Sequence, residues 1–273
     1  MQISRAAQQR ARPGAPARPQ WRSMASLSPF ALLFITLLVA YVYTPPRWQD
    51  WNQNSRIDLT MAIVDQGTIR IDDYVANTGD YALIDGHAYS DKAPGLSLAA
   101  VPVYAATRIA QPLGLRAISD RLARGGAFND TLTVGGEGLS RQRVDQMVAL
   151  YAATIVCVAL PAALMGVLLA RCVERIAGCR TAGILAALII GLASPVFTYA
   201  QAFYGHVPAA ACVVGAVACI ILRDGDTLSD RRLAAIGALL GAAVMIEYPS
   251  AVVAAPIALW ALALSGRRAV IWG

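Results

Sequence analysis

The sequence has a single lysine and few charged residues of any kind. Lys92 is the only lysine among 23 basic residues, and charged side chains make up 15% of a chain that is 57% hydrophobic. This composition excludes an ordinary soluble domain, in which about 25% of residues are charged. The net charge of +6 does not predict nucleic-acid binding, because the arginines form short clusters between apolar runs. We expect membrane lipids as partners and no nucleic acid.

Useful cysteine spacing and intramembrane charge are also lacking. The five cysteines lie in or between apolar runs, with neither a disulfide framework nor a zinc spacing. The long apolar runs of the sequence are nearly free of ionisable residues. The exceptions are Glu247 and His206, and each lies at the end of a run. A proton-coupled transporter or ion channel needs charge near the bilayer centre. Transport is therefore disfavoured.

Six apolar runs predict membrane-crossing helices. They cover residues 24–43, 147–170, 181–200, 207–222, 233–246 and 251–264. The first would be about 30 Å long as a helix, enough to span the hydrocarbon core, whereas the last two would reach only about 21 Å. The run at residues 24–43 also lacks a signal-peptide cleavage site, so we interpret it as a retained membrane anchor. The predicted fold class is an all-α polytopic membrane protein with about six transmembrane helices.

A further apolar run, residues 95–109, sets the topology. If it crossed the membrane, the Arg-rich connections at 171–180, 223–232 and 267–268 would face outward, against the positive-inside rule. We therefore predict an interfacial helix there. The resulting segments are a disordered Arg-rich cytoplasmic tail (1–23), a first transmembrane helix (24–44), an extracytoplasmic loop (45–146), a five-helix transmembrane region (147–264) and a cytoplasmic end (265–273).

The predicted extracytoplasmic loop is acidic and holds 12 of the 17 acids. Within it, residues 55–67 predict a short helix with Ser55 as N-cap, Asp58 in the first turn and Gly67 as terminator. Two short extended segments follow, and the sequence Asp85-Gly86 predicts the tight turn of a hairpin between them.

Two stretches of this loop carry a family resemblance. The order of "NSRIDLTMAIVDQGTIRID" and "YSDKAPGLSLAAVPVYA", after an Arg-rich start and one crossing, resembles the N-terminal portion of bacterial GT-C glycosyltransferases. These enzymes depend on polyprenyl-phosphate sugars and include protein O-mannosyltransferases and lipid A aminoarabinose transferases. The resemblance is most specific around Asp91-Lys92-Ala93-Pro94. It implies a multi-pass protein of the bacterial inner membrane with a cytoplasmic N-terminus, as part of a longer enzyme whose further crossings follow residue 273.

The resemblance implies transfer of a sugar from a polyprenyl-phosphate donor to a glycan, lipid or protein acceptor on the extracytoplasmic face. Inverting transfer needs a carboxylate to deprotonate the acceptor hydroxyl and cations to hold the phosphate. The candidate catalytic carboxylates are Asp91, Asp58 and Asp50, and the candidate substrate-binding residues are Lys92, Arg56, Glu247 and His206. A divalent metal is compatible with this chemistry, although no cofactor is clearly indicated.

One departure from the family pattern keeps an alternative open. Gln53 and Asn54 stand where the family usually has an acidic pair, and an amide cannot accept a proton as a carboxylate does. The alternative is a non-catalytic membrane protein that binds a lipid phosphate, or a partial homologue that acts as an assembly partner.

Overall fold

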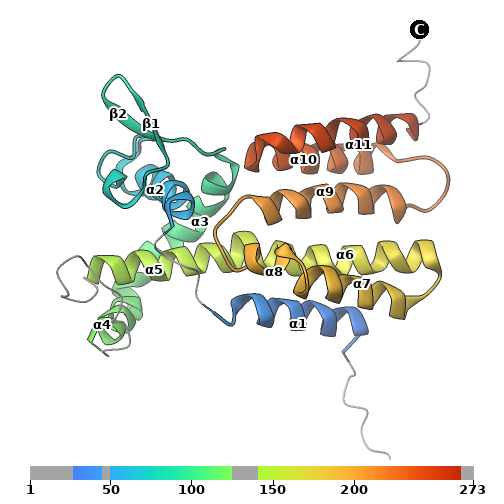
Figure 1. The fold of residues 1–273 in the computed structure, drawn as a ribbon, viewed down its shortest axis with the longest axis horizontal. Coiled ribbons are helices and arrows are strands. Elements are labelled where there is room, and N and C mark those ends of the chain that lie inside the picture. The colour runs from blue at the N-terminus through green and yellow to red at the C-terminus, as the bar shows by residue number, and fades with distance from the viewer. Residues whose placement is uncertain (1–26, 45–49, 125–140, 266–273) are drawn as a thin grey trace, which may run out of the picture.

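The computed structural model describes residues 27–44, 50–124 and 141–265. This part of the chain is mostly helical and includes one two-stranded antiparallel hairpin (Figure 1). The predicted helical class is therefore confirmed. The predicted tail, residues 1–23, and residues 266–273 of the predicted cytoplasmic end lie outside the described residues.

A bundle of roughly parallel helices forms the larger part of the molecule (Figure 1). Its helices are α1 (Pro29–Val42), α6 (Leu160–Ala177), α7 (Arg180–Leu192), α8 (Pro195–Tyr199), α9 (His206–Ile221), α10 (Asp230–Ile246) and α11 (Ala251–Ala263). A 3₁₀ turn, η4 (Tyr248–Ser250), joins the last two. Helix α6 continues from α5 (Arg141–Thr154) through a π-helical turn, η3 (Ile155–Ala159), so this long helix reaches beyond the bundle.

Residues 50–124 form a second layer at one end of the bundle, which we call the crown (Figure 1). Its elements are α2 (Trp51–Gln66), η1 (Val75–Asn77), β1 (Tyr81–Ile84), β2 (His87–Ser90), α3 (Gly95–Ala110), the π-helical turn η2 (Gln111–Leu115) and α4 (Arg116–Arg124). Helix α3 covers the predicted interfacial run. It packs against α2 and also contacts α5 and the end of α10.

Among the residues that the structure describes, one helix is both long and apolar enough to cross a membrane, as judged by length and composition. It covers the 33 residues Asp145–Ala177. Four other apolar helices are shorter, with 10–17 residues: Pro29–Val42, Arg180–Leu192, His206–Ile221 and Tyr248–Ala263. Because a crossing takes about 20 residues, the six-span architecture stays a prediction.

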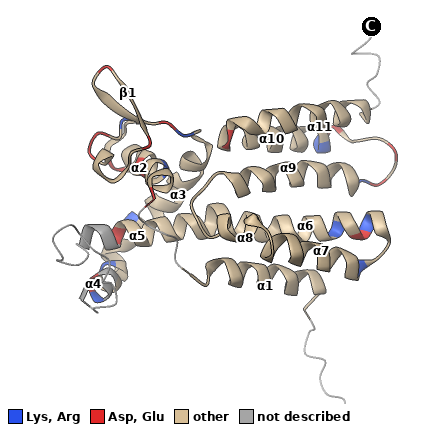
Figure 2. Ribbon diagram, viewed as in Figure 1, with Lys and Arg blue, Asp and Glu red and all other residues tan. Residues whose placement is uncertain are grey.

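The two ends of the bundle differ from its middle in charge. Four segments lie together at the end of the bundle opposite the crown (Figure 1). They are the start of α1, the α6–α7 connection, the α9–α10 connection and the end of α11. Figure 2 shows charged residues near both ends and almost none along the middle of the bundle. We call the end opposite the crown the arginine end, because the end of α6 carries Arg171 and Arg175, the end of α9 is followed by Arg223, and the first turn of α10 carries Arg232.

The predicted helix over residues 181–200 is broken. Helix α7 stops at Leu192, and α8 starts at Pro195. Ser194 is the N-cap of α8, since its hydroxyl accepts a hydrogen bond from the N–H of Val196 at 3.2 Å. Pro195 has no N–H to continue α7, but it suits the first turn of a new helix.

The predicted start of the first crown helix at Ser55 is wrong. The observed N-cap is Asp50, five residues before Ser55, and helix α2 begins at Trp51. Asp50 Oδ1 accepts hydrogen bonds from the N–H groups of Asn52 and Gln53, at 3.0 and 3.2 Å. After Trp51 the next apolar residue of this helix is Ile57, so its first turns carried no periodic signal.

The other turn predictions in the crown are confirmed. Gly67 ends α2 in the left-handed conformation, with φ of 67°. Asp85 and Gly86 join β1 to β2 with positive φ values of 50° and 79°. Both central residues of a type I′ turn need positive φ, which Gly and Asp tolerate. The hairpin register follows from this turn, and Tyr81 pairs with Ser90 at its open end.

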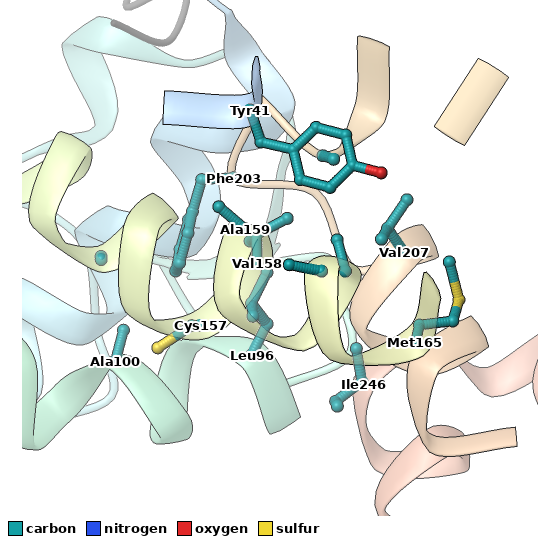
Figure 3. Packing of buried hydrophobic residues seen from close by; sticks show 14 of the residues in the cluster. Tyr41, Leu96, Ala100, Cys157, Val158, Ala159, Met165, Phe203, Val207 and Ile246 are labelled. Carbon is teal, nitrogen blue, oxygen red and sulfur yellow. The ribbon is translucent and has the colours of Figure 1, made fainter. Parts of the chain in front are cut away.

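The crown and the bundle share one hydrophobic core. Leu96 from α3, Phe203 from the loop before α9, Val158 and Ile246 lie in the same buried cluster (Figure 3). Gly95 allows this approach, because a Cβ there would lie 2.6 Å from the backbone carbonyl of Met245. The start of α3 is therefore held against the end of α10.

Gly95→Ala is expected to destabilise the protein by about 1–3 kcal/mol, because its methyl group would push α3 away from a backbone that cannot rotate aside. Gly237→Ala in α10 is the matched control, since a Cβ there meets nothing within 4 Å. The control should be stabilising by up to about 1 kcal/mol through helix propensity. Thermal unfolding in detergent micelles tests both, and equal midpoints for the two variants would contradict the close contact.

Candidate functional site

Arg56 connects the crown to the bundle. Its guanidinium is 2% exposed and makes three hydrogen bonds through different nitrogens. Nη2 donates to Glu247 Oε1 at 2.6 Å, Nη1 to the carbonyl oxygen of Ala93 at 3.3 Å, and Nε to Asn52 Oδ1 at 3.1 Å. Burial lowers the pKa of Arg56, and the Glu247 carboxylate opposes this shift. Arg56 thus joins α2, the segment before α3 and the end of α10.

Glu247 also contacts His206, the first residue of α9. Glu247 Oε1 lies 3.5 Å from His206 Nδ1. Gly205 makes room for this carboxylate, because a Cβ there would lie 2.3 Å from Oε1. The His206 ring stacks on Tyr204, with centroids 6.0 Å apart, and meets the edge of Tyr199 at 5.1 Å. Three residues singled out in the sequence, Arg56, Glu247 and His206, therefore form one cluster.

Lys92 is held between two aspartates. Its Nζ lies 2.8 Å from Asp80 Oδ2 and 3.1 Å from Asp91 Oδ1, and its side chain is 19% exposed. Burial lowers the pKa of Lys92, but the hydrogen bonds to Asp80 and Asp91 outweigh this effect and raise the pKa above its ordinary value. The ammonium is therefore charged at neutral pH.

A pocket of about 460 Å³ opens where the crown meets the bundle, and we call it the crown pocket. It is lined by Asp50, Trp51, Asn52, Asp80, Tyr199, Tyr204 and His206. Its volume falls within the range of small-molecule sites. Carboxylates accept hydrogen bonds from hydroxyl groups, and aromatic rings offer flat apolar faces. This combination suits a polyhydroxylated ligand with apolar ring faces.

Asp50 already has protein partners in this pocket. Oδ1 caps α2, and Oδ2 accepts a hydrogen bond from the Tyr204 hydroxyl at 2.6 Å. Asp80 lines the same pocket, and its ion pair with Lys92 uses Oδ2. Asp80 is therefore the carboxylate in this pocket that is not committed to a helix N-terminus.

Gln53 and Asn54, the two amides at the start of α2, are buried and hydrogen-bonded. Gln53 Oε1 accepts a hydrogen bond from the N–H of Phe203 at 2.7 Å. Asn54 Nδ2 donates to the carbonyl oxygen of Asn77 at 2.8 Å, which a carboxylate could not do. These amides connect α2 to the loop before α9 and to η1.

Asp58 lies inside the crown and does not line the crown pocket. Asn77 Nδ2 donates to Asp58 Oδ1 at 3.0 Å, while Asp58 Oδ2 and Asn77 Oδ1 are buried without a hydrogen-bond partner among the described residues. Burial raises the pKa of Asp58 to about 8, against the opposite effect of the Asn77 hydrogen bond. A proton on Asp58 supplies the donor that this pair lacks, so its neutral form is favoured at pH 7.

The structure thus gathers most of the predicted site residues into two adjoining groups, joined at the crown pocket. Asp50 and His206 line the pocket, Lys92 and Asp91 meet at its Asp80 side, and Arg56 with Glu247 lies behind His206. Asp58 lies apart. Asp80 and Tyr204 were missed. The predicted turn could have identified Asp80, because counting outward from Asp85-Gly86 places residue 80 opposite residue 91, next to Lys92.

Within the described residues, no group of three or more His, Cys, Asp or Glu side chains is placed to hold a metal ion. The sequence matches no protein-family model, no curated protein and no solved structure. The function must therefore be argued from the chemistry of the site.

Proposed function

We propose that this protein is a multi-pass membrane glycosyltransferase that transfers a sugar from a polyprenyl-phosphate donor to an acceptor on the extracytoplasmic face. The membrane part of this proposal is supported by large apolar side chains that point outward from α1, α7 and α11. They are Leu32, Ile35, Val39, Leu185, Ile189, Val252, Leu259 and Trp260. Such surfaces are unusual on soluble monomers but are expected where lipid tails are the solvent.

The orientation follows from the charges. The arginine end of the bundle fits a cytoplasmic face under the positive-inside rule, and the acidic crown then lies on the extracytoplasmic side. A lipid-linked sugar would reach the crown pocket from the outer leaflet of the bacterial inner membrane. Its chain would remain in the hydrocarbon beside the bundle.

The crown pocket is the single observation that carries the enzymatic proposal. It combines aspartates with Trp51, Tyr199 and Tyr204, as sugar binding requires, and it adjoins Lys92. Asp80 accepts the proton of the acceptor hydroxyl as the oxygen attacks the anomeric carbon. The bond from that carbon to the phosphate oxygen breaks, and the polyprenyl phosphate leaves with an added negative charge, which Lys92 stabilises.

The remaining residues position this site. Arg56 is buried among protein partners, so we assign it to holding the Lys92 segment through Ala93. Glu247 orients His206, which lines the pocket and is available to hydrogen-bond a sugar hydroxyl or the phosphate. Asp91 shares the Lys92 ammonium and keeps it in place when Asp80 turns to the acceptor.

The non-catalytic alternative is favoured by one observation, the pairing of Lys92 with two carboxylates. A phosphate must compete with both aspartates for the ammonium. In that alternative the pocket binds a lipid-linked sugar and passes it to a partner protein, without Asp80 acting as a base.

Asp80→Asn is expected to lower sugar transfer by about 10²-fold or more, the usual cost of losing a general base. Transfer of labelled sugar from a panel of polyprenyl-phosphate sugars, in membranes that contain the full chain, measures it. Asp85→Asn is the matched control. It makes the same chemical change at the exposed turn of the same hairpin, where Asn tolerates positive φ.

Equal transfer by wild type, Asp80→Asn and Asp85→Asn would overturn the assignment of the base. The wild-type protein could instead transfer sugar from none of the donors but bind them in a pull-down. If Lys92→Ala weakens that binding, the non-catalytic alternative is correct. If the wild-type protein neither transfers sugar from the donors nor binds them, the proposed function fails.

A further inference from the structure

An apolar groove of about 530 Å³ runs between α6, α9 and α10, away from the crown pocket. Leu164 and Leu168 of α6, Ala211 and Gly215 of α9 and Leu239 of α10 are among its lining residues. The small residues of α9 keep the groove open between larger side chains. A groove of this composition suits an alkyl chain.

One charged side chain belongs to the groove lining, and it lies at the arginine end. Arg232, in the first turn of α10, lines the groove. Its Nη1 donates to the carbonyl oxygen of Cys219 at 3.2 Å, and its Nη2 lies 4.0 Å from a carboxylate oxygen of the exposed Asp224. A guanidinium with a distant, solvated partner retains donors for an anion.

A second pocket, of about 460 Å³, continues from the groove through Leu222, which lines both. Arg171 and Arg175 line this second pocket with Glu174 and Asp224. Glu174 is already paired with Arg180 at 2.9 Å, whereas Arg171 and Arg175 make no ion pair in the part of the chain that the structure describes. Apolar groove and unpaired arginines therefore meet at one point.

We propose that this continuous site binds one anionic phospholipid. An acyl chain lies in the groove, and the phosphate lies between Arg232 on one side and Arg171 and Arg175 on the other. Charge complementarity selects the occupant, because the groove ends at cations at the bilayer surface where phosphates lie. The inference rests on the membrane placement proposed above and not on sugar transfer. It adds a lipid site at the end of the bundle opposite the crown pocket.

Native mass spectrometry of the purified full chain, titrated with dioleoyl phosphatidylglycerol, tests the site. Arg232→Gln is expected to weaken binding about tenfold, equivalent to about 1.4 kcal/mol. Ala211→Phe, which fills the groove from a half-buried position, should weaken binding at least as much. Arg231→Gln is the matched control, because Arg231 adjoins Arg232 in the sequence but is exposed and does not line the groove. A melting curve for each variant confirms folding.

Two further probes separate the head from the chain. Dioleoyl phosphatidylcholine has the same chains without net charge, and inorganic phosphate has the charge without a chain. Tenfold weaker binding of both than of phosphatidylglycerol supports the proposal. Equal binding of phosphatidylcholine, competition by free phosphate alone, no loss in Arg232→Gln, or a dimer that Ala211→Phe converts to monomer would each overturn it. Loss of sugar transfer with phosphatidylglycerol binding intact would count only against the proposed enzyme.

Discussion

Arg56→Met is expected to lower the free energy of unfolding by about 3–5 kcal/mol, because it leaves Glu247 without its cation in a site with little access to water. Glu247 is 17% exposed, and its remaining contact, His206, lies 3.5 Å away. Glu247→Leu should cost a similar amount, since it leaves a buried guanidinium unpaired. The double variant should recover much of the loss, because the uncompensated charge is gone.

Denaturant titration in detergent micelles of wild type, the two single variants and the double variant gives the coupling energy between Arg56 and Glu247. Arg180→Met is the matched control. Arg180 pairs with Glu174 at 2.9 Å but is 58% exposed, so its loss should cost at most about 1 kcal/mol. A coupling energy below about 1 kcal/mol for the buried pair would show that water or His206 replaces Arg56, contrary to the geometry.

Asp58 is expected to make the protein less stable as the pH rises. Its pKa is about 8 in the folded protein but near 4 in an unfolded chain, so the folded state binds the extra proton between these values. The stabilising contribution is complete below about pH 4 and declines up to about pH 8, by at most about 1.4 kcal/mol per pH unit. Thermal unfolding in micelles between pH 5.5 and 9 measures this slope.

Asp58→Asn should remove the slope and be more stable than wild type at pH 9, because the amide stays neutral where the buried Asp58 carboxyl is mostly ionised. Asp58→Ala should cost about 1–3 kcal/mol at pH 6, because Asn77 loses its buried partner. The exposed Asp85→Asn variant keeps the wild-type slope. An unchanged pH dependence in Asp58→Asn would mean that Asp58 is ionised in the folded protein.

The helices of the bundle were largely predictable, because a long apolar run in a chain with so few charges indicates a helix. The predicted run at residues 207–222 corresponds to α9 within a residue at each end. The break at Ser194-Pro195 was missed because apolar residues continue on both sides of it. The early start of α2 was missed for the opposite reason, since Trp51 is the one apolar residue in its first six and the start depends on a cap by Asp50.

The candidate site was predictable only in part. Lys92 is singled out in the sequence because it is the single lysine, and Asp91 is its direct neighbour. Asp80 follows from the hairpin register, but only once the turn residues are trusted. No local pattern relates Arg56 to Glu247, because their contact depends on how α10 meets the crown. The two residues are 191 positions apart, and no periodic pattern in the sequence relates residues at that separation.

The Arg56–Glu247 ion pair also sets an order on biosynthesis. Arg56 is synthesised 191 residues before its carboxylate partner, which corresponds to roughly 10–40 s at typical rates of protein synthesis. Throughout that interval the crown holds a guanidinium whose native partner does not yet exist. The Ala93 segment and His206 acquire their final surroundings only after α10 and Glu247 have been made, so the pocket at the crown is completed after them.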